Sequence, residues 1–61
     1  MNNDFGYNLS NLRKKKNLTQ EQLANFLNIS PAAICKWEKG KSLPDLPMLI
    51  LLSKYFHISI D

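Results

Sequence analysis

The 61-residue chain has one cysteine and one histidine, and this scarcity excludes two common ways of stabilising a small protein. Cys35 has no second cysteine for a disulfide, and together with His57 it supplies too few ligands for a metal cluster. The apolar run at residues 46–52 contains Pro47 and is much too short to span a bilayer. We therefore expect a domain held by helix packing alone, with no cofactor or metal, no membrane partner and a cytoplasmic location.

The composition also lacks the groups that an enzyme needs. Cys35 and His57 are the only nucleophile and base of note, and they fall on different predicted elements. No third group or oxyanion loop accompanies them, and no phosphate-binding glycine loop occurs. The sequence therefore predicts that the protein is not an enzyme.

Positive charge is modest in amount but concentrated in position. The net charge is +3, and seven of the eight cations lie between Arg13 and Lys41. They form two clusters, residues 13–16 and the set of Lys36, Lys39 and Lys41. Either cluster alone is typical of a solvated helix end, where lysine also complements the helix dipole. Brought to one side of a domain, the two would favour phosphate binding.

Hydrophobic spacing predicts four helices and the beginning of a fifth, with no strand. The expected helices cover residues 4–15, 20–27, 31–39 and 46–56. In the first helix, Phe5, Leu9 and Leu12 should face inward. Asp4 should cap this helix, and Gly6 should weaken its first turn.

Local signals mark the second and third helices. Thr19 can cap the second helix, because its hydroxyl reaches a backbone N–H of the first turn while Gln22 reaches back to Thr19. Asn28 can adopt the left-handed conformation that ends a helix. Ser30 followed by Pro31 is typical of a cap and a first helical residue. Two short helices joined by a tight polar turn are expected.

Each of these two helices has one apolar face. Leu23, Ala24 and Leu27 form a stripe on the first of them, and Ile34 and Trp37 lie three apart on the second. A lone tryptophan could stack on a base in a protein that binds single strands. Its spacing from Ile34 favours the core instead.

Several of these features recur together at fixed offsets. They are Thr-Gln at 19–20, Leu-Ala at 23–24, Ile-Ser at 29–30, Ile34, and Trp-Glu-Lys-Gly at 37–40. This arrangement resembles the helix-turn-helix of Cro and lambda-type phage repressors and their bacterial relatives, over residues 5–60. The resemblance implies an all-α fold, a compact four- to five-helix lambda-repressor-like bundle. Residues 1–61 would form one DNA-binding domain, with the helix-turn-helix proper at about 19–39.

In such a fold the third helix enters the major groove of DNA. The resemblance implies base contacts by residues near the start of that helix, namely Ser30, Pro31, Ala32, Ala33 and Lys36. It implies phosphate contacts by a second set, namely Asn17, Thr19, Gln20, Lys39, Lys41 and Ser42. For Thr19 and Gln20 the backbone N–H groups would contribute, because helix N-termini attract anions.

The expected base-reading residues depart from those of the better-known repressors. Proline and alanine cannot make the bidentate hydrogen bonds that glutamine or asparagine makes to adenine. Readout would rest on alanine methyls against thymine methyls, on Ser30, and on Lys36 against guanine. Ala32 and Ala33 are equally explained as good helix formers on an exposed face. We expect weak specificity from a single domain.

Arg13 and Glu38 match a pair that in relatives bridges the end of the first helix to the end of the third. Both side chains would be partly buried. The pair would therefore aim the third helix and would read no sequence itself.

The last expected helix is apolar on two faces. Beside its inward stripe, Met48, Leu51 and Tyr55 form a second one that would need a partner, although single apolar residues also scatter on surfaces. Phe56-His57-Ile58-Ser59 repeats the pattern of Leu27-Asn28-Ile29-Ser30, so a fifth helix should begin after Ser59. The chain is then expected to be part of a longer protein.

These features predict a transcriptional regulator that binds double-stranded DNA, most simply a repressor that occludes a promoter. A homodimer of the full-length protein on an inverted-repeat operator would double the sequence that is read. The alternative is a helix-turn-helix fold used as a protein-interaction module or as an accessory domain of a longer enzyme. Weak base readers favour this alternative, whereas the clustered cations and Gln20 oppose it.

Overall fold

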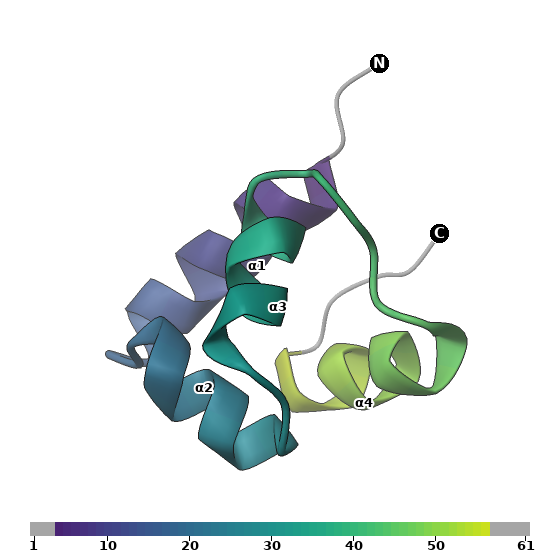
Figure 1. Ribbon diagram of the computed structural model, residues 1–61. Helices are drawn as coiled ribbons and strands as arrows, with labels where there is room; N and C mark the ends of the chain where they lie inside the picture. The colour runs from purple at the N-terminus through teal and green to yellow at the C-terminus, as the bar shows by residue number, and fades with distance from the viewer. Residues whose placement is uncertain (1–3, 57–61) are drawn as a thin grey trace.

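The structure is a computed structural model that describes residues 4–56, in which four helices are joined by short connections (Figure 1). The helices are α1 (Asp4–Lys15), α2 (Gln20–Leu27), α3 (Pro31–Glu38) and α4 (Leu46–Phe56). The predicted all-α fold is confirmed, and no strand occurs among the described residues. α1 begins at Asp4, and α3 ends one residue before Lys39. The fifth helix expected after Ser59 lies outside the described residues.

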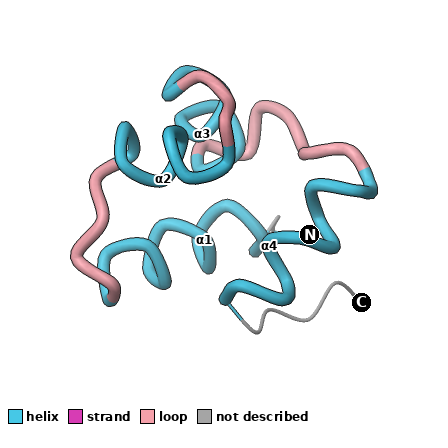
Figure 2. The backbone as a smooth tube through the Cα atoms, turned by 90° about the horizontal axis from the view of Figure 1, so that it is seen from below, coloured by secondary structure: helices cyan, strands magenta, loops and turns pink. Residues whose placement is uncertain are grey.

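The helices lie in two layers. Seen from below, α2 and α3 occupy one layer, and α1 and α4 occupy the other (Figure 2). The segment after α3 arches from the end of that helix to the start of α4 (Figure 1). Between residues 4 and 56, no helix is both long and apolar enough to cross a membrane.

The core forms where the apolar faces of all four helices meet. Its largest fully buried side chains come one from each helix, namely Leu9, Leu23, Ile34 and Leu52. Trp37 is 8% exposed and belongs to the same cluster, so the sequence prediction of a core tryptophan is confirmed. A core of this kind holds α3 from behind and leaves its opposite side in solvent.

Side-chain caps begin three of the helices, at Thr19 and Ser30 as the sequence predicts and also at Asp45. At α2, Gln22 N donates to Thr19 Oγ1 over 3.0 Å, and Thr19 N donates to Gln22 Oε1 over 2.9 Å. Ser30 Oγ accepts from the N–H of Ala33, the third residue of α3, and Asp45 Oδ1 accepts from the N–H of Met48, the third residue of α4. These caps satisfy backbone donors that have no partner within their own helix.

The first three helices all end in the same backbone motif. In each, a residue in the left-handed region follows the last turn: Asn17 (φ 59°), Asn28 (φ 61°) and Gly40 (φ 75°). The N–H of the next residue then donates to a carbonyl five residues back, in the Schellman pattern. These bonds are Leu18 to Arg13 (3.1 Å), Ile29 to Ala24 (2.9 Å) and Lys41 to Lys36 (2.9 Å). The sequence predicted this geometry at Asn28 and missed it at Asn17.

The second apolar stripe predicted on α4 is only partly exposed. Met48 and Tyr55 pack against the core of this domain, and the ring of Tyr55 lies 4.5 Å from that of Phe26 on α2. Lys16 Nζ covers the Tyr55 ring at 5.1 Å. Leu51 remains 43% exposed. Met48 and Tyr55 therefore do not form an uncovered stripe, and Tyr55 is covered by Phe26 of α2 and by Lys16 after α1.

Gly6 lies where α1 passes closest to α3. A Cβ atom at this position would lie 2.3 Å from the carbonyl oxygen of Trp37 and 2.7 Å from that of Glu38. Both neighbours are backbone atoms, which cannot turn aside as a flexible side chain does. The sequence predicted only a weakened first turn at Gly6, whereas the structure shows that the crossing of α1 and α3 depends on it.

Replacing Gly6 by alanine should therefore lower the free energy of unfolding by about 2 kcal/mol, because helix crossing and the added methyl group are incompatible. Alanine is intrinsically the better helix former, so its propensity acts in the opposite direction. Urea unfolding measures the difference, with Asn8→Ala as the control at an exposed position of the same helix. The control should be neutral or stabilising. A Gly6→Ala variant as stable as the wild type would contradict the close approach.

Candidate nucleic-acid interface

The first turn of α3 presents a small, mostly apolar surface to solvent. Ser30, Pro31 and Ala32 are exposed, and Lys36 is exposed one turn beyond Ala32. Because residues four apart share a helix face, Ala32 and Lys36 lie one above the other. Ala33 is half-buried and packs against the core, so it is less open to a partner than the other four expected base-reading residues.

The residues expected at phosphates fall into two groups. Asn17, Thr19 and Gln20 surround the start of α2, and a second group, Lys39, Lys41 and Ser42, follows α3. All are exposed except Gln20, which is half-buried. The first group lies at the start of α2 and the second follows the end of α3, and the Gln20–Glu38 hydrogen bond joins these two helix ends.

Two of the expected donors near α2 already have partners within the chain. The N–H of Thr19 donates to Gln22 Oε1, so this group does not offer its proton to a phosphate. The side-chain amide of Gln20 donates to Glu38 Oε1 over 3.0 Å. The Thr19 N–H and one of the two N–H groups of the Gln20 amide are therefore engaged within the chain.

The exposed basic surface is smaller than the sequence suggests. Arg13 is 8% exposed and lies inside the domain, so it does not belong with the lysines that follow it. Lys16 is drawn toward the ring of Tyr55. Lys14, Lys15 and Lys16 are all exposed at the end of α1, in addition to the three lysines of α3 and the segment after it.

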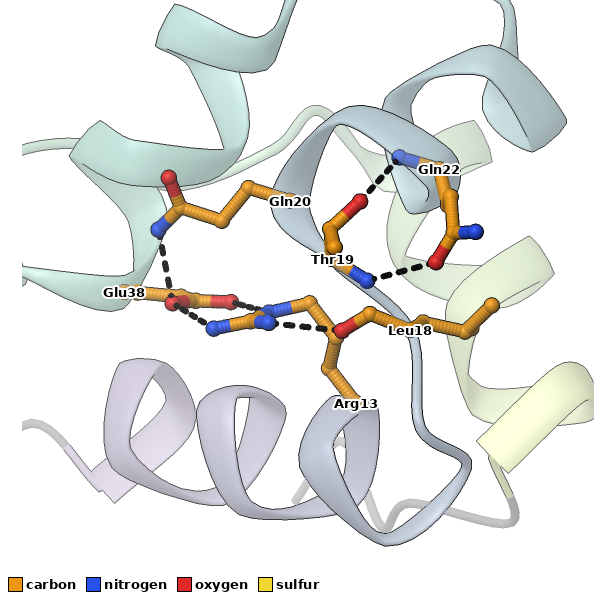
Figure 3. Close-up of polar contacts among 6 residues, drawn as sticks. All are labelled: Arg13, Leu18, Thr19, Gln20, Gln22 and Glu38. Carbon is orange, nitrogen blue, oxygen red and sulfur yellow. Dashed lines mark hydrogen bonds and ion pairs between the residues drawn. The ribbon is translucent and has the colours of Figure 1, made fainter.

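Arg13 lies at the centre of a polar network that joins three helices (Figure 3). Its Nε donates to Glu38 Oε2 over 2.6 Å, and its Nη2 donates to Glu38 Oε1 over 3.1 Å. Its Nη1 donates to the carbonyl oxygen of Leu18 over 2.7 Å. Gln20 Nε2 completes the network at Glu38. One guanidinium thus holds the end of α3 and the segment that leads into α2.

The structure brings Arg13 and Glu38 together as the sequence pattern expects, and it adds two members. The contribution of the Leu18 carbonyl is invisible in the sequence, because any residue supplies the same group. Gln20 was assigned a different partner, and its separation of 18 residues from Glu38 gave no local signal. Among the described residues, no buried side-chain nitrogen or oxygen lacks a hydrogen-bond partner.

Glu38 stays ionised despite its burial. Burial raises the pKa of its carboxyl group, but hydrogen bonds from Arg13 and Gln20 and the positive charges of Arg13 and Lys14 lower it. The lowering prevails, so the pKa of Glu38 lies below its ordinary value of 4.5. The hydrogen bond to Glu38 raises the pKa of Arg13 against the effect of burial. The pair is therefore charged at neutral pH.

Glu38→Ala should lower the free energy of unfolding at pH 7 by about 3 kcal/mol, because it leaves Arg13 buried without its partner. Since the folded-state pKa of Glu38 is depressed, the stability it contributes is present above 4.5 and is lost as the pH falls through the folded-state pKa. The difference between wild type and variant should therefore shrink in acid. Urea unfolding from pH 7 to pH 3 measures this difference.

A double variant provides the control for this experiment. Arg13→Met with Glu38→Ala removes both charges, so it should recover part of the loss caused by Glu38→Ala alone. Losses that simply add in the double-mutant cycle would show that the ion pair contributes nothing to folding.

The chain matches the family model described as helix-turn-helix over residues 9–61. It is 50% identical over 58 residues to the HTH-type transcriptional activator BcrR of Enterococcus faecalis, covering 95% of this chain and 28% of that protein. It is 39% identical over 57 residues to the uncharacterized HTH-type transcriptional regulator YqaE of Bacillus subtilis (strain 168), covering 93% and 49%.

A third relative is the cryptic phage CTXphi transcriptional repressor RstR of Vibrio cholerae, which is 40% identical over 53 residues. That match covers 87% of this chain and 47% of the repressor. The chain thus spans between about a quarter and a half of the length of these three relatives. No solved structure gives a significant match.

Proposed function

Because this chain belongs to the helix-turn-helix family of the Cro and lambda-repressor type, we propose that it binds double-stranded DNA sequence-specifically as the DNA-binding domain of a transcriptional regulator. The observation that carries the proposal is the exposed first turn of α3, held from behind by the core and by the Arg13–Glu38 pair. Proteins of this family are not enzymes. With DNA as the partner, the proposed location is the cytoplasm.

In the proposed complex α3 lies in the major groove. Ser30 and Lys36 supply hydrogen bonds to base edges, and Pro31 and Ala32 supply apolar contact with thymine methyl groups. Ala33 contributes less, because it packs partly against the core. Base readout from so few polar groups gives modest specificity for one domain.

Phosphates on either side of the groove would be bound by the two groups of residues before α2 and after α3. After α3, Lys39, Lys41 and Ser42 are exposed and free of the domain core. Before α2, the proposed donors are the Asn17 side chain, the Thr19 hydroxyl and the backbone N–H of Gln20. The positive end of the α2 dipole supports an anion at this place.

Repression by occlusion is the simplest outcome of such binding, because a protein on a promoter excludes polymerase. The named relatives include an activator and a repressor. In an activator or a repressor the domain would bind DNA in the same way. The position of the operator relative to the promoter would determine whether transcription is activated or repressed. A reporter with the bound site inside or upstream of a promoter tests this part.

Lys36→Ala should reduce discrimination at one or two base pairs by roughly 1–3 kcal/mol, whereas Lys39→Ala should weaken binding to all duplexes alike. The measurement is affinity for a selected duplex and for an unrelated duplex across a salt series. Lys54→Ala, an exposed lysine on α4, is the control. Equal losses on both duplexes for Lys36→Ala would make Lys36 a phosphate ligand. Absence of salt-dependent duplex binding by the wild type would favour the protein-interaction module.

We further propose that the full-length protein acts as a homodimer on an inverted repeat. Single apolar residues are common on surfaces, but here four occur on and just before α4. They are Leu43, Leu46, Ile50 and Leu51, with exposed fractions of 60%, 61%, 40% and 43%. Two-fold symmetry would then place two α3 helices on one face of the DNA, with half-site centres roughly 34 Å apart.

Leu51→Glu should shift the full-length protein from dimer toward monomer, because it places a charge in an apolar interface. Sedimentation measures the change, and Lys54→Glu, at an exposed charged position of the same helix, is the control. A stable dimer unaffected by Leu51→Glu would exclude an α4 interface. A full-length monomer bound to DNA would exclude the dimer altogether.

A further inference from the structure

The side chain of Gln20 links α2 directly to α3, whereas the Arg13–Glu38 ion pair links α1 to α3. Gln20 is the first residue of α2, and Glu38 is the last residue of α3. The amide Nε2 of Gln20 donates over 3.0 Å to Glu38 Oε1, the same oxygen that accepts from Arg13 Nη2. Gln20 is half-buried, so this contact forms at the edge of the core.

The backbone around Gln20 is held from both directions. The reciprocal hydrogen bonds between Thr19 and Gln22 fix the first turn of α2. Arg13 Nη1 holds the Leu18 carbonyl, two residues before Gln20. The backbone of Gln20 is therefore fixed in place. Its side-chain contact with Glu38 then restrains the end of α3 relative to the start of α2.

The charge of Glu38 also determines which way the amide faces. A carboxylate only accepts hydrogen bonds, so the nitrogen of the Gln20 amide must point toward Glu38. The amide oxygen then points away from Glu38, as Figure 3 shows. An oxygen cannot donate to a phosphate, so only the second N–H of the Gln20 amide remains as a side-chain donor for an anion.

The contact links opposite ends of the helix-turn-helix. The short turn at residues 28–30 connects the end of α2 to the start of α3. The Gln20–Glu38 hydrogen bond connects the start of α2 to the end of α3. The Gln20 contact thus adds a direct tie between α2 and α3 to the holds that Arg13 and the core already place on α3.

We propose that Gln20 is a positioning residue, whose side chain fixes the angle of α3 and thereby sets base discrimination. The proposal rests on the proposed function in DNA binding. Hydrogen bonds to base edges require close placement of α3, whereas long lysine side chains reach phosphates over a range of positions. Loss of the Gln20 contact should thus affect base readout much more than overall attraction to DNA.

The test uses Gln20→Met, which keeps the length of the side chain and removes its amide. Affinity is measured for a duplex selected by the wild type from a randomised pool, and for an unrelated duplex of equal length. The selected duplex should lose about tenfold in affinity, the scale of one hydrogen bond to a charged group, and the unrelated duplex less than about twofold. Asn25→Ala, at an exposed and uncharged position of the same helix, is the control and should change neither affinity.

Circular dichroism at the assay temperature establishes that the variants are folded. A second measurement follows the side-chain amide of Gln20 by NMR in the wild type, with the amide of Gln22 as internal reference. Exchange of the Gln20 amide hydrogens should remain slower than that of Gln22 before and after addition of the selected duplex. This second result is independent of any substitution.

Three outcomes would overturn the proposal. Equal loss on both duplexes would make the Gln20 side chain a phosphate ligand. Unchanged affinity for both would show that the contact does not position α3. If the wild type selects no duplex at all, the proposed function itself fails, and the NMR signal of the Gln20 amide still reports whether the hydrogen bond exists.

Discussion

The buried carboxylate of Glu38 is the constraint on which the arrangement of the helices depends. It accepts two hydrogen bonds from Arg13 of α1 and one from Gln20 of α2. A buried charge without such partners would be strongly destabilising, so α3 can end at this place only if α1 and α2 present these donors. Burial of apolar side chains is not directional, so the hydrogen bonds of this network help to determine how the helices are oriented around the core.

Close packing against α1 reinforces the same geometry. Gly6 allows the backbone of α1 to approach the last turn of α3, and the backbone oxygens of Trp37 and Glu38 fill the space that a Cβ would occupy. A chain of this length buries a small core, so each close contact contributes a larger share of its stability than in a larger domain. Both features act on the end of α3. Gly6 allows α1 to approach it closely, and the Arg13–Glu38 ion pair attracts the two helices.

Features that depend on neighbouring residues could be predicted from the sequence, and features that join distant residues mostly could not. The capping box at Thr19 and the left-handed turn at Asn28 are local, and both were predicted correctly. Asn17 precedes Leu18 as Asn28 precedes Ile29, so its left-handed conformation had the same signal. Burial of Met48 and Tyr55 required knowledge of what lies over α4. The contacts of Gly6 and Gln20 span more than fifteen residues and leave no trace in local spacing.

The exposed residues of α3 explain why the position of this helix matters for the proposed DNA binding. The exposed residues of its first turn include Pro31 and Ala32, which offer no hydrogen bonds to bases, and only Ser30 and Lys36 supply polar groups. A recognition helix rich in amides can adjust its side chains to an imperfect position, because each long side chain has several rotamers. Contacts between methyl groups have no such reach and depend on distance alone. In the proposed complex, discrimination therefore comes from where α3 is held as much as from which side chains it carries.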